Sequence, residues 1–266
     1  MKNLFAGIKD VYDFLKQSKS CVFIFDFDGT LSPLAKTPEM AFIPEETKTC
    51  LTLLKKFFPV AIVSGRDLED VKQKVGIRGL IYAGSHGFDW EIEGKRSSIK
   101  IDPRTKKALK SAMEKIRKIL PNYTGAFLEE KGYGFSVHFR LLKKIKEKLF
   151  LENLQRIKEE IEKEGYLNAF FGKKVLEFRP KVNFDKGTFT QYLINHFKTR
   201  NRIKPTAVYV GDDTTDEDAF SVLTEKDVSV YVGKKKKSKA VYFIANQEKV
   251  EDFICGFLKE LGFYNL

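Results

Sequence analysis

Residues 21–33 read CVFIFDFDGTLSP. An apolar run rich in aromatic residues leads into two carboxylates, Asp26 and Asp28, and then into an Asp-Gly pair. A short continuous apolar run is typical of a strand buried on both faces, and Asp-Gly is a strong turn signal. The stretch alone fits an ordinary strand and turn. It equally fits a site in which one carboxylate attacks or holds a metal while the other transfers protons.

Length and composition indicate a globular protein of one large domain or two smaller ones, because the chain has 266 residues of which 42% are hydrophobic. No apolar run reaches the length of a membrane span, and the first ten residues lack the pattern of a signal peptide, so we expect a cytoplasmic protein. The three cysteines, Cys21, Cys50 and Cys255, are odd in number and widely spaced in apolar sequence. We expect them to pack in the core rather than to form disulfides or a zinc site.

The net charge of +12 raises the question of nucleic-acid binding. The densest basic run, KKKKSK at 234–239, separates two strand-like segments and has no aromatic residues between its lysines. Such a run is more typical of a solvated loop than of a surface that stacks bases. We therefore expect no nucleic-acid and no membrane partner, and the excess of lysine could instead attract a small anionic substrate.

The first part of the chain alternates strands with helices. Short apolar runs predict strands, and segments with apolar residues at helical spacing predict helices between them. The predicted strands are 21–25, 60–63 and 80–84, and the predicted helices are 44–57 and 67–75. This alternation predicts a parallel sheet with right-handed crossovers.

The pattern changes at about residue 104. A basic amphipathic helix, a hairpin, a second charged helix at about 143–164 and a second hairpin give the order αββαββ. The alternation of strands and helices then resumes from a helix starting at residue 185. We predict an α/β protein whose core, residues 1–103 and 182–266, is a Rossmann-like parallel sheet, with an α+β unit inserted at 104–181.

Polar residues follow three of the predicted strands. Asp26 follows the first, Ser64-Gly65-Arg66 the second, and Gly211-Asp212-Asp213 a later strand at 207–210. The carboxyl ends of parallel strands lie on one edge of the sheet, where ligands bind, so these residues should meet. The second and third groups could each be an ordinary helix start.

The third group has a feature that a helix start does not explain. Asp212 and Asp213 directly follow a buried strand, and they would repel Asp26 and Asp28 unless a cation lay between them. Oxygen ligands with retained waters suit Mg²⁺. The sequence therefore predicts a magnesium site at this edge of the sheet.

Positive and N–H donors are also expected there. Arg66, Lys186, the backbone after Asp26 and the Ser64 hydroxyl could face a phosphate dianion, and this inventory suits phosphoryl transfer. Asp26 would attack phosphorus, while Asp28 would protonate the leaving oxygen and later activate water.

The motifs DFDGT, SGR, RPKVNFDKG and GDDTTDED resemble, in this order, the four motifs of the haloacid dehalogenase superfamily of phosphatases. The segments YAGSHG at 82–87, LEEKGYGFSVHFR at 128–140 and LEFRP at 176–180 are similar to the trehalose-6-phosphate phosphatase family. The resemblance runs from about residue 20 to the C-terminus. It implies a Mg²⁺-dependent phosphatase that hydrolyses trehalose 6-phosphate through an aspartyl-phosphate, with the inserted unit as a cap and a trehalose-phosphate synthase in the same pathway.

The resemblance also implies a role for each matching residue. Asp26 and Asp28 correspond to the nucleophile and the general acid and base, and Ser64 and Lys186 to the phosphate-binding groups. The metal ligands would be Asp26, the backbone carbonyl of Asp28, Asp212 and, through water or outer contacts, Asp213 and Asp216. The substrate-binding residues would be Gly65, Arg66, His86, Glu129, Lys131, His138, Arg140, Glu177 and Arg179.

Two residues depart from the family pattern. Phe184 stands where relatives often have tryptophan, and Glu130 replaces an asparagine, which adds a negative charge near the predicted sugar contacts. Phosphates of glucosylglycerol, mannosylglycerate, glucosylglycerate and sucrose therefore stay open as substrates. A sugar-phosphate-binding regulatory domain without catalysis also stays open.

Overall fold

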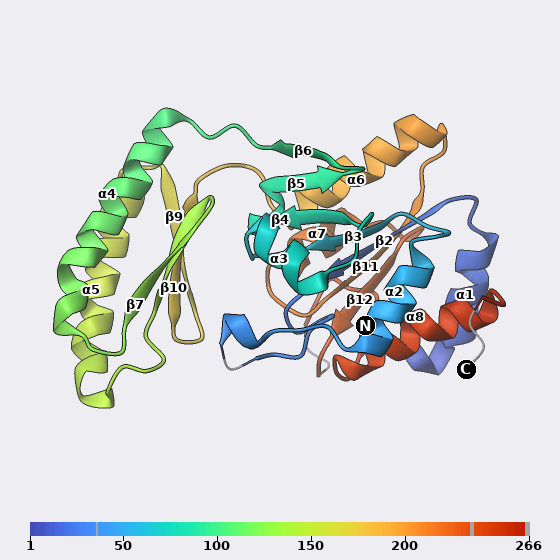
Figure 1. Ribbon diagram of the computed structural model, residues 1–266, viewed down its shortest axis with the longest axis horizontal. Helices are drawn as coiled ribbons and strands as arrows, with labels where there is room; N and C mark the ends of the chain where they lie inside the picture. Colours follow the sequence, from blue (N-terminus) through green and yellow to red (C-terminus); the bar gives the residue numbers. More distant parts are fainter. Residues whose placement is uncertain (36, 235–236, 264–266) are drawn as a thin grey trace. The chain divides into compact units, whose positions relative to one another are not determined.

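The chain folds around two separate β-sheets (Figure 1). The computed structural model describes residues 1–35, 37–234 and 237–263, so residues 235 and 236 of the basic run lie outside the described residues. One unit comprises Met1–Ser98 and Phe184–Leu266, and we call it the core unit; Ile99–Asn183 form the cap unit. Among the described helices, none has both the length and the apolar character that a membrane crossing requires.

The core unit contains a nine-stranded sheet in the order β1-β13-β12-β11-β2-β3-β4-β5-β6. Its strands are β1 (Lys2–Asn3), β2 (Cys21–Asp26), β3 (Val60–Val63), β4 (Ile81–Gly84), β5 (Asp89–Ile92), β6 (Lys95–Ser98), β11 (Thr206–Gly211), β12 (Val228–Val232) and β13 (Tyr242–Ile244). From β1 to β4 all neighbours are parallel, which confirms the predicted parallel sheet shared by the two ends of the chain. The β5–β6 hairpin is antiparallel and was not predicted, since β6 reads KRSS and is fully exposed.

Helices cover both faces of this sheet. They are α1 (Ile8–Gln17), α2 (Glu45–Leu54), α3 (Leu68–Val75), α6 (Lys186–Asn201), α7 (Asp216–Val222) and α8 (Glu248–Glu260), with short 3₁₀ segments at Leu4–Gly7, Pro38–Met40 and Ser85–Gly87. Successive strand residues point to opposite faces. On one face Phe23 of β2 contacts Phe257 of α8, and on the other Tyr209 of β11 contacts Phe220 of α7.

The expectation that the cysteines only pack in the core was wrong for two of them. Cys50 of α2 and Cys255 of α8 form a disulfide, with 5.6 Å between their Cα atoms. The two helices pack on the same face of the sheet, so cysteines 205 positions apart in the sequence become neighbours. The free cysteine, Cys21, is buried in β2 as expected.

The cap unit has its own antiparallel sheet and hydrophobic core. Its elements, in the predicted αββαββ order, are α4 (Pro103–Ile119), a 3₁₀ turn at Leu120–Asn122, β7 (Phe127–Lys131), β8 (Gly134–His138), α5 (Lys144–Lys163), β9 (Leu167–Gly172) and β10 (Val175–Pro180). The strand order is β7-β8-β10-β9. Apolar side chains of α4 and α5 pack with Phe135, Val137 and Phe178 of the sheet. The alternate strand residues, Glu129 and Glu177 among them, therefore lie on the other face.

The strand order of the core unit fixes where a ligand can bind. From β2 the chain moves through β3 and β4 to one side, and then returns to place β11 on the other side of β2. Such a reversal opens a crevice at the carboxyl ends of the two strands where the direction changes. In this sheet the direction changes between β2, which ends at Asp26, and β11, which ends at Gly211.

Candidate active site

The predicted residues that follow the strands do meet at one edge of the core sheet. Asp26 is the last residue of β2, which pairs in parallel with β3 on one side and β11 on the other. Ser64 directly follows β3, and Asp212 directly follows β11. Asp26 and Ser64 are almost completely buried, at 4% and 1% exposure. Because the three strands are parallel neighbours, these three residues lie together at one edge of the sheet.

A glycine brings the chain after β2 close to Asp212. Gly29 has a φ of +81°, and a Cβ atom at this position would lie 2.2 Å from Asp212 Oδ2. A positive φ is costly for residues with a Cβ, and the space beside Asp212 excludes one. The turn that the DG pair predicted is therefore also a close approach between two segments of the site.

Lys186 lies between two carboxylates. Its Nζ atom donates to Asp26 Oδ1 at 2.7 Å and to Asp216 Oδ1 at 2.8 Å. Lys186 opens α6, where the side chain of Asp185 accepts a hydrogen bond from Thr188 N and so caps the helix. Burial opposes the charge of the ammonium, but Asp216 and Asp26 outweigh it and raise the pKa of Lys186 above its usual range. The lysine therefore stays charged inside the sheet edge.

Asp216 begins α7, and its carboxylate accepts more hydrogen bonds than an acidic residue at the start of a helix needs. Besides Lys186, its Oδ1 atom accepts a hydrogen bond from the Tyr209 hydroxyl at 2.8 Å, and its Oδ2 atom accepts one from Asp213 N at 2.9 Å. Asp216 and Tyr209 are both fully buried. Tyr209 was not predicted as a site residue, because an aromatic residue in a buried strand looks like ordinary core.

Three carboxylates converge at this point. Asp26, Asp212 and Asp216 each offer an oxygen atom, and these atoms lie within 4.8 Å of one another. One ammonium group cannot balance three carboxylates. Burial and the neighbouring charges raise the pKa of Asp26 well above its usual range and that of Asp212 to about 7. A hard divalent cation with oxygen ligands, such as Mg²⁺, fits this excess of buried negative charge.

The side chains of Asp28 and Asp213 have other partners. The side chain of neither belongs to the cluster of three carboxylates. Asp213 is exposed; its backbone supports Asp216, while its carboxylate accepts a hydrogen bond from Thr214 Oγ1 at 3.2 Å. Both carboxylate oxygens of Asp28 accept hydrogen bonds from Arg66. Of the two residues expected to make outer contacts with a metal, Asp216 has its side chain in the cluster and Asp213 does not.

Ser64, Gly65 and His86 form one wall of the site. The hydroxyl oxygen of Ser64 accepts a hydrogen bond from Arg66 N at 3.1 Å, and His86 N donates to the carbonyl oxygen of Ser64 at 2.8 Å. A Cβ atom on Gly65 would lie 2.6 Å from the His86 ring, so the glycine makes room for it. The helix that follows begins at Leu68, and Asp67 precedes it without a side-chain capping bond.

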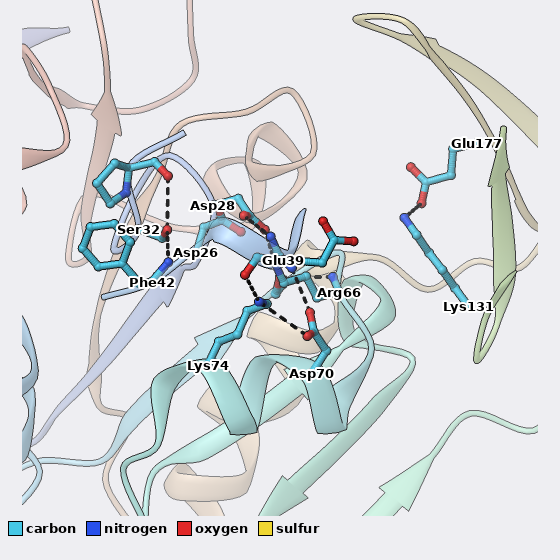
Figure 2. Close-up of polar contacts among 12 residues, drawn as sticks. Asp26, Asp28, Ser32, Glu39, Phe42, Arg66, Asp70, Lys74, Lys131 and Glu177 are labelled. Atoms are coloured by element: carbon cyan, nitrogen blue, oxygen red, sulfur yellow. Dashed lines mark hydrogen bonds and ion pairs between the residues drawn. The ribbon is translucent and has the colours of Figure 1, made fainter. Parts of the chain in front are cut away.

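Arg66 connects Asp28 to α3. Figure 2 shows its guanidinium group between Asp28 and Asp70, to which it donates from Nη1 at 2.8 Å. Asp70 was not predicted, although its position four residues after Arg66 in a helix start would have allowed it. Arg66 therefore contacts a predicted catalytic residue.

The predicted sugar-contacting residues of the cap unit share the open face of its sheet. Glu129, Ser136 and Glu177 form one row across β7, β8 and β10. Ion pairs and hydrogen bonds link the predicted residues on this face: Lys131 with Glu177 at 3.5 Å, drawn in Figure 2, Arg179 with Glu177 at 2.7 Å, and His138 with Glu129 at 2.8 Å. The Ser136 hydroxyl, 1% exposed as a residue, has no hydrogen-bond partner among the described residues.

Arg140 lies outside the strands of this sheet, and Glu130 lies on its other face. Arg140 lies two residues past the end of β8 and is exposed, so the alternation of the strand does not place it beside His138. Glu130 alternates with Glu129 and forms an ion pair with Arg117 of α4. The charge of Glu130 therefore lies on the helix side of the cap sheet, opposite to Glu129.

Phe184, the other departure from the family pattern, packs in an aromatic cluster of the core unit. Its ring stacks on Trp90 with 5.8 Å between centroids and contacts Phe88 at 6.3 Å. His196 of α6, which fits no motif, contacts the ring of Phe197. Both residues have packing roles in the core unit.

The chain is similar in sequence to known proteins. The family model described as trehalose-phosphatase matches residues 24–249. A probable trehalose-phosphate phosphatase D from Arabidopsis thaliana is 34% identical over 254 residues, which cover 90% of this chain and 67% of that protein. The chain spans about two thirds of the length of its plant relatives and about half that of its mycobacterial relatives.

Solved structures show the same fold. The C-terminal domain of the Candida albicans trehalose-6-phosphate phosphatase aligns with a TM-score of 0.81 at 20% identity, covering 95% of this chain and 97% of that one. A haloacid dehalogenase-like hydrolase from Bacteroides thetaiotaomicron aligns with a TM-score of 0.64 at 16% identity, covering 89% and 98%. The expected fold is confirmed, and the chain belongs to the trehalose-phosphatase family.

Proposed function

We propose that this protein hydrolyses trehalose 6-phosphate to trehalose and inorganic phosphate. The observation that carries the proposal is the position of Asp26, buried at the end of β2, 2.7 Å from Lys186 and clustered with Asp212 and Asp216. A nucleophilic carboxylate beside a fixed cation and a cluster of oxygen ligands is the arrangement that phosphoryl transfer to a side chain requires. The names of the relatives supply the substrate.

The chain's own residues account for each step of the reaction. Asp26 attacks phosphorus as the bond to the sugar oxygen breaks, and Asp28 gives its proton to that oxygen. A water molecule then attacks the aspartyl-phosphate, Asp28 takes the proton from the water, and the bond between phosphorus and Asp26 breaks. Lys186 and the Ser64 hydroxyl hold the phosphate oxygens during both steps.

A Mg²⁺ ion would be held by the side chains of Asp26, Asp212 and Asp216 and by the backbone carbonyl of Asp28. When bound, it supplies positive charge that offsets the buried carboxylates and the phosphate. Tyr209 and the backbone of Asp213 would keep Asp216 in place for it. This assignment gives Asp216 the direct contact and Asp213 a supporting one.

The cap unit would select the sugar. Its open sheet face carries Glu129, Lys131 and Glu177, whose acceptors and donors suit hydroxyl groups, which donate and accept together. Arg179 and His138 extend this surface on either side. A synthase that makes the phosphorylated disaccharide is the partner that this activity requires.

The test is the release of inorganic phosphate from a panel of sugar phosphates. Trehalose 6-phosphate with Mg²⁺ should be turned over fastest. EDTA should abolish the turnover, because the ammonium group of Lys186 does not by itself balance the three carboxylates of the cluster. Faster turnover of a glucosylglycerol, sucrose or glycerate-linked sugar phosphate would move the assignment to that substrate. No metal-dependent turnover of any member would overturn the phosphatase function.

Asp26→Asn is the matched variant, since it keeps the size of the side chain and removes the nucleophile. It should lose turnover by several orders of magnitude with a melting curve close to that of the wild type. Binding of trehalose 6-phosphate to the variant should persist, because the groups proposed to hold the phosphate and the sugar are unchanged. Turnover close to that of the wild type would contradict the role of Asp26.

A further inference from the structure

Arg66 uses donors on three sides of its guanidinium group. Nε and Nη2 each donate to one oxygen of Asp28, both at 2.7 Å, and Nη1 donates to Asp70 Oδ2 at 2.8 Å (Figure 2). Its side chain is only 11% exposed, and its Cζ atom lies 5.3 Å from the centroid of the Phe27 ring.

We propose that Arg66 and Asp70 are positioning residues for the proton transfers of Asp28, an inference that rests on the phosphatase function proposed above. The side chain of Asp28 is 39% exposed and would rotate freely without a partner. A guanidinium group that binds both oxygens fixes the plane of the carboxylate as well as its place. Asp70, in the first turn of α3, holds the other side of the guanidinium and so ties that plane to the helix.

Both chemical steps need this orientation. In the first, Asp28 carries a proton on one carboxyl oxygen and must point it at the sugar oxygen that leaves, while Arg66 donates to the other oxygen. In the second, Asp28 must take a proton from water at the same place. Proton transfer by a positioned side chain contributes roughly 100- to 10,000-fold to such reactions, and a displacement of about 1 Å can forfeit much of it. Asp70 contacts Arg66 at 2.8 Å and Lys74 at 3.9 Å, and the contacts described link it neither to Ser64 or Lys186 nor to the cluster of three carboxylates. Its effect on Asp28 therefore passes through Arg66.

Asp70→Asn tests this with two substrates whose leaving groups differ. Trehalose would leave as a poorly stabilised alkoxide unless Asp28 protonated its oxygen, whereas p-nitrophenolate is stable enough to leave without a proton. For trehalose 6-phosphate we expect kcat to fall roughly tenfold or more with KM within about twofold. For p-nitrophenyl phosphate we expect a burst of about one nitrophenol per protein and then slow turnover, because only the hydrolysis of the aspartyl-phosphate still needs Asp28.

Two further variants separate positioning from a merely structural role. Glu69→Gln removes the same charge from the same helix turn, but Glu69 pairs with Lys72 and Arg96, so its kinetics should match the wild type. Asp70→Glu keeps the carboxylate and should restore part of kcat and reduce the burst.

Two outcomes for Asp70→Asn would overturn the inference while leaving the phosphatase function intact. One is wild-type kcat on both substrates; the other is an equal loss on both substrates with no burst. If the wild type itself turned over neither substrate with Mg²⁺, the proposed function would fail, and the inference with it.

Discussion

The disulfide between Cys50 and Cys255 should contribute measurably to the stability of the core unit. It joins residues separated by 205 positions, and in the chain-entropy description a cross-link that closes a loop of this length removes about 5 kcal/mol of entropy from the unfolded chain. Measured contributions are commonly about 2–4 kcal/mol. For a protein of this size each kcal/mol corresponds to roughly 2–4 °C in Tm, so breaking the bond should lower Tm by about 5–10 °C.

The perturbation is the double variant Cys50→Ala and Cys255→Ala. Alanine is preferred to serine because Cys50 is fully buried and a hydroxyl there would need a partner. Cys21→Ala is the matched control, since it removes a buried thiol that forms no cross-link. The assay is thermal unfolding of all three proteins with and without dithiothreitol. Only proteins that retain the disulfide should lose stability on reduction.

Alkylation of the unfolded chain counts the free thiols directly. Unreduced wild-type protein should take up one equivalent of iodoacetamide, at Cys21, and reduced protein should take up three. Three equivalents without reduction, or a wild-type Tm that does not respond to dithiothreitol, would refute the reasoning. Phosphatase activity at moderate temperature should be unchanged in the double variant, because neither cysteine contacts the site residues described above.

Three other predictions concern single substitutions. Gly29→Ala should lower kcat by roughly 100-fold or more and reduce Tm, because its Cβ would meet Asp212 at a positive φ; wild-type turnover would contradict this. Tyr209→Phe should raise the Mg²⁺ concentration for half-maximal activity by roughly tenfold, because Asp216 loses a hydrogen-bond donor. The measurement is a metal titration of activity, and an unchanged titration would contradict this role of Tyr209. Ser136→Ala should lower kcat/KM for trehalose 6-phosphate by roughly three- to tenfold and leave kcat/KM for p-nitrophenyl phosphate unchanged. Equal effects on both substrates would show that Ser136 does not contact the sugar.

Much of the fold could be predicted because its signals are local. The apolar run before Asp26 and the run at Val60–Val63 read as buried strands, and the alternation with amphipathic helices implied a parallel sheet. The positions of Ser64 and Asp212 at the same edge then followed from the geometry of parallel strands. The β6 strand escaped prediction because an exposed polar edge strand has no apolar alternation to detect.

The unpredicted features of the site depend on partners from distant segments. Asp216 fitted a helix start, and only the folded chain shows Lys186 and Tyr209 bound to its carboxylate. In the sequence Asp70 looks like an ordinary acidic residue in the first turn of a helix, and only the folded chain shows its hydrogen bond with Arg66. The cysteine pair likewise has no signature in sequence, because two helices from opposite ends of the chain must first pack together.

The strand order also has a consequence for synthesis on the ribosome. β2 is among the first strands made, yet its neighbour β11, Thr206–Gly211, emerges only after the entire cap unit has been translated. Until then one edge of β2 has no neighbouring strand, and an apolar edge of this kind invites pairing with other chains. The cap unit, with its own hydrophobic core, can fold during this interval. We therefore expect nascent chains that end before residue 206 to need chaperones, and those that extend past residue 211 to need them much less.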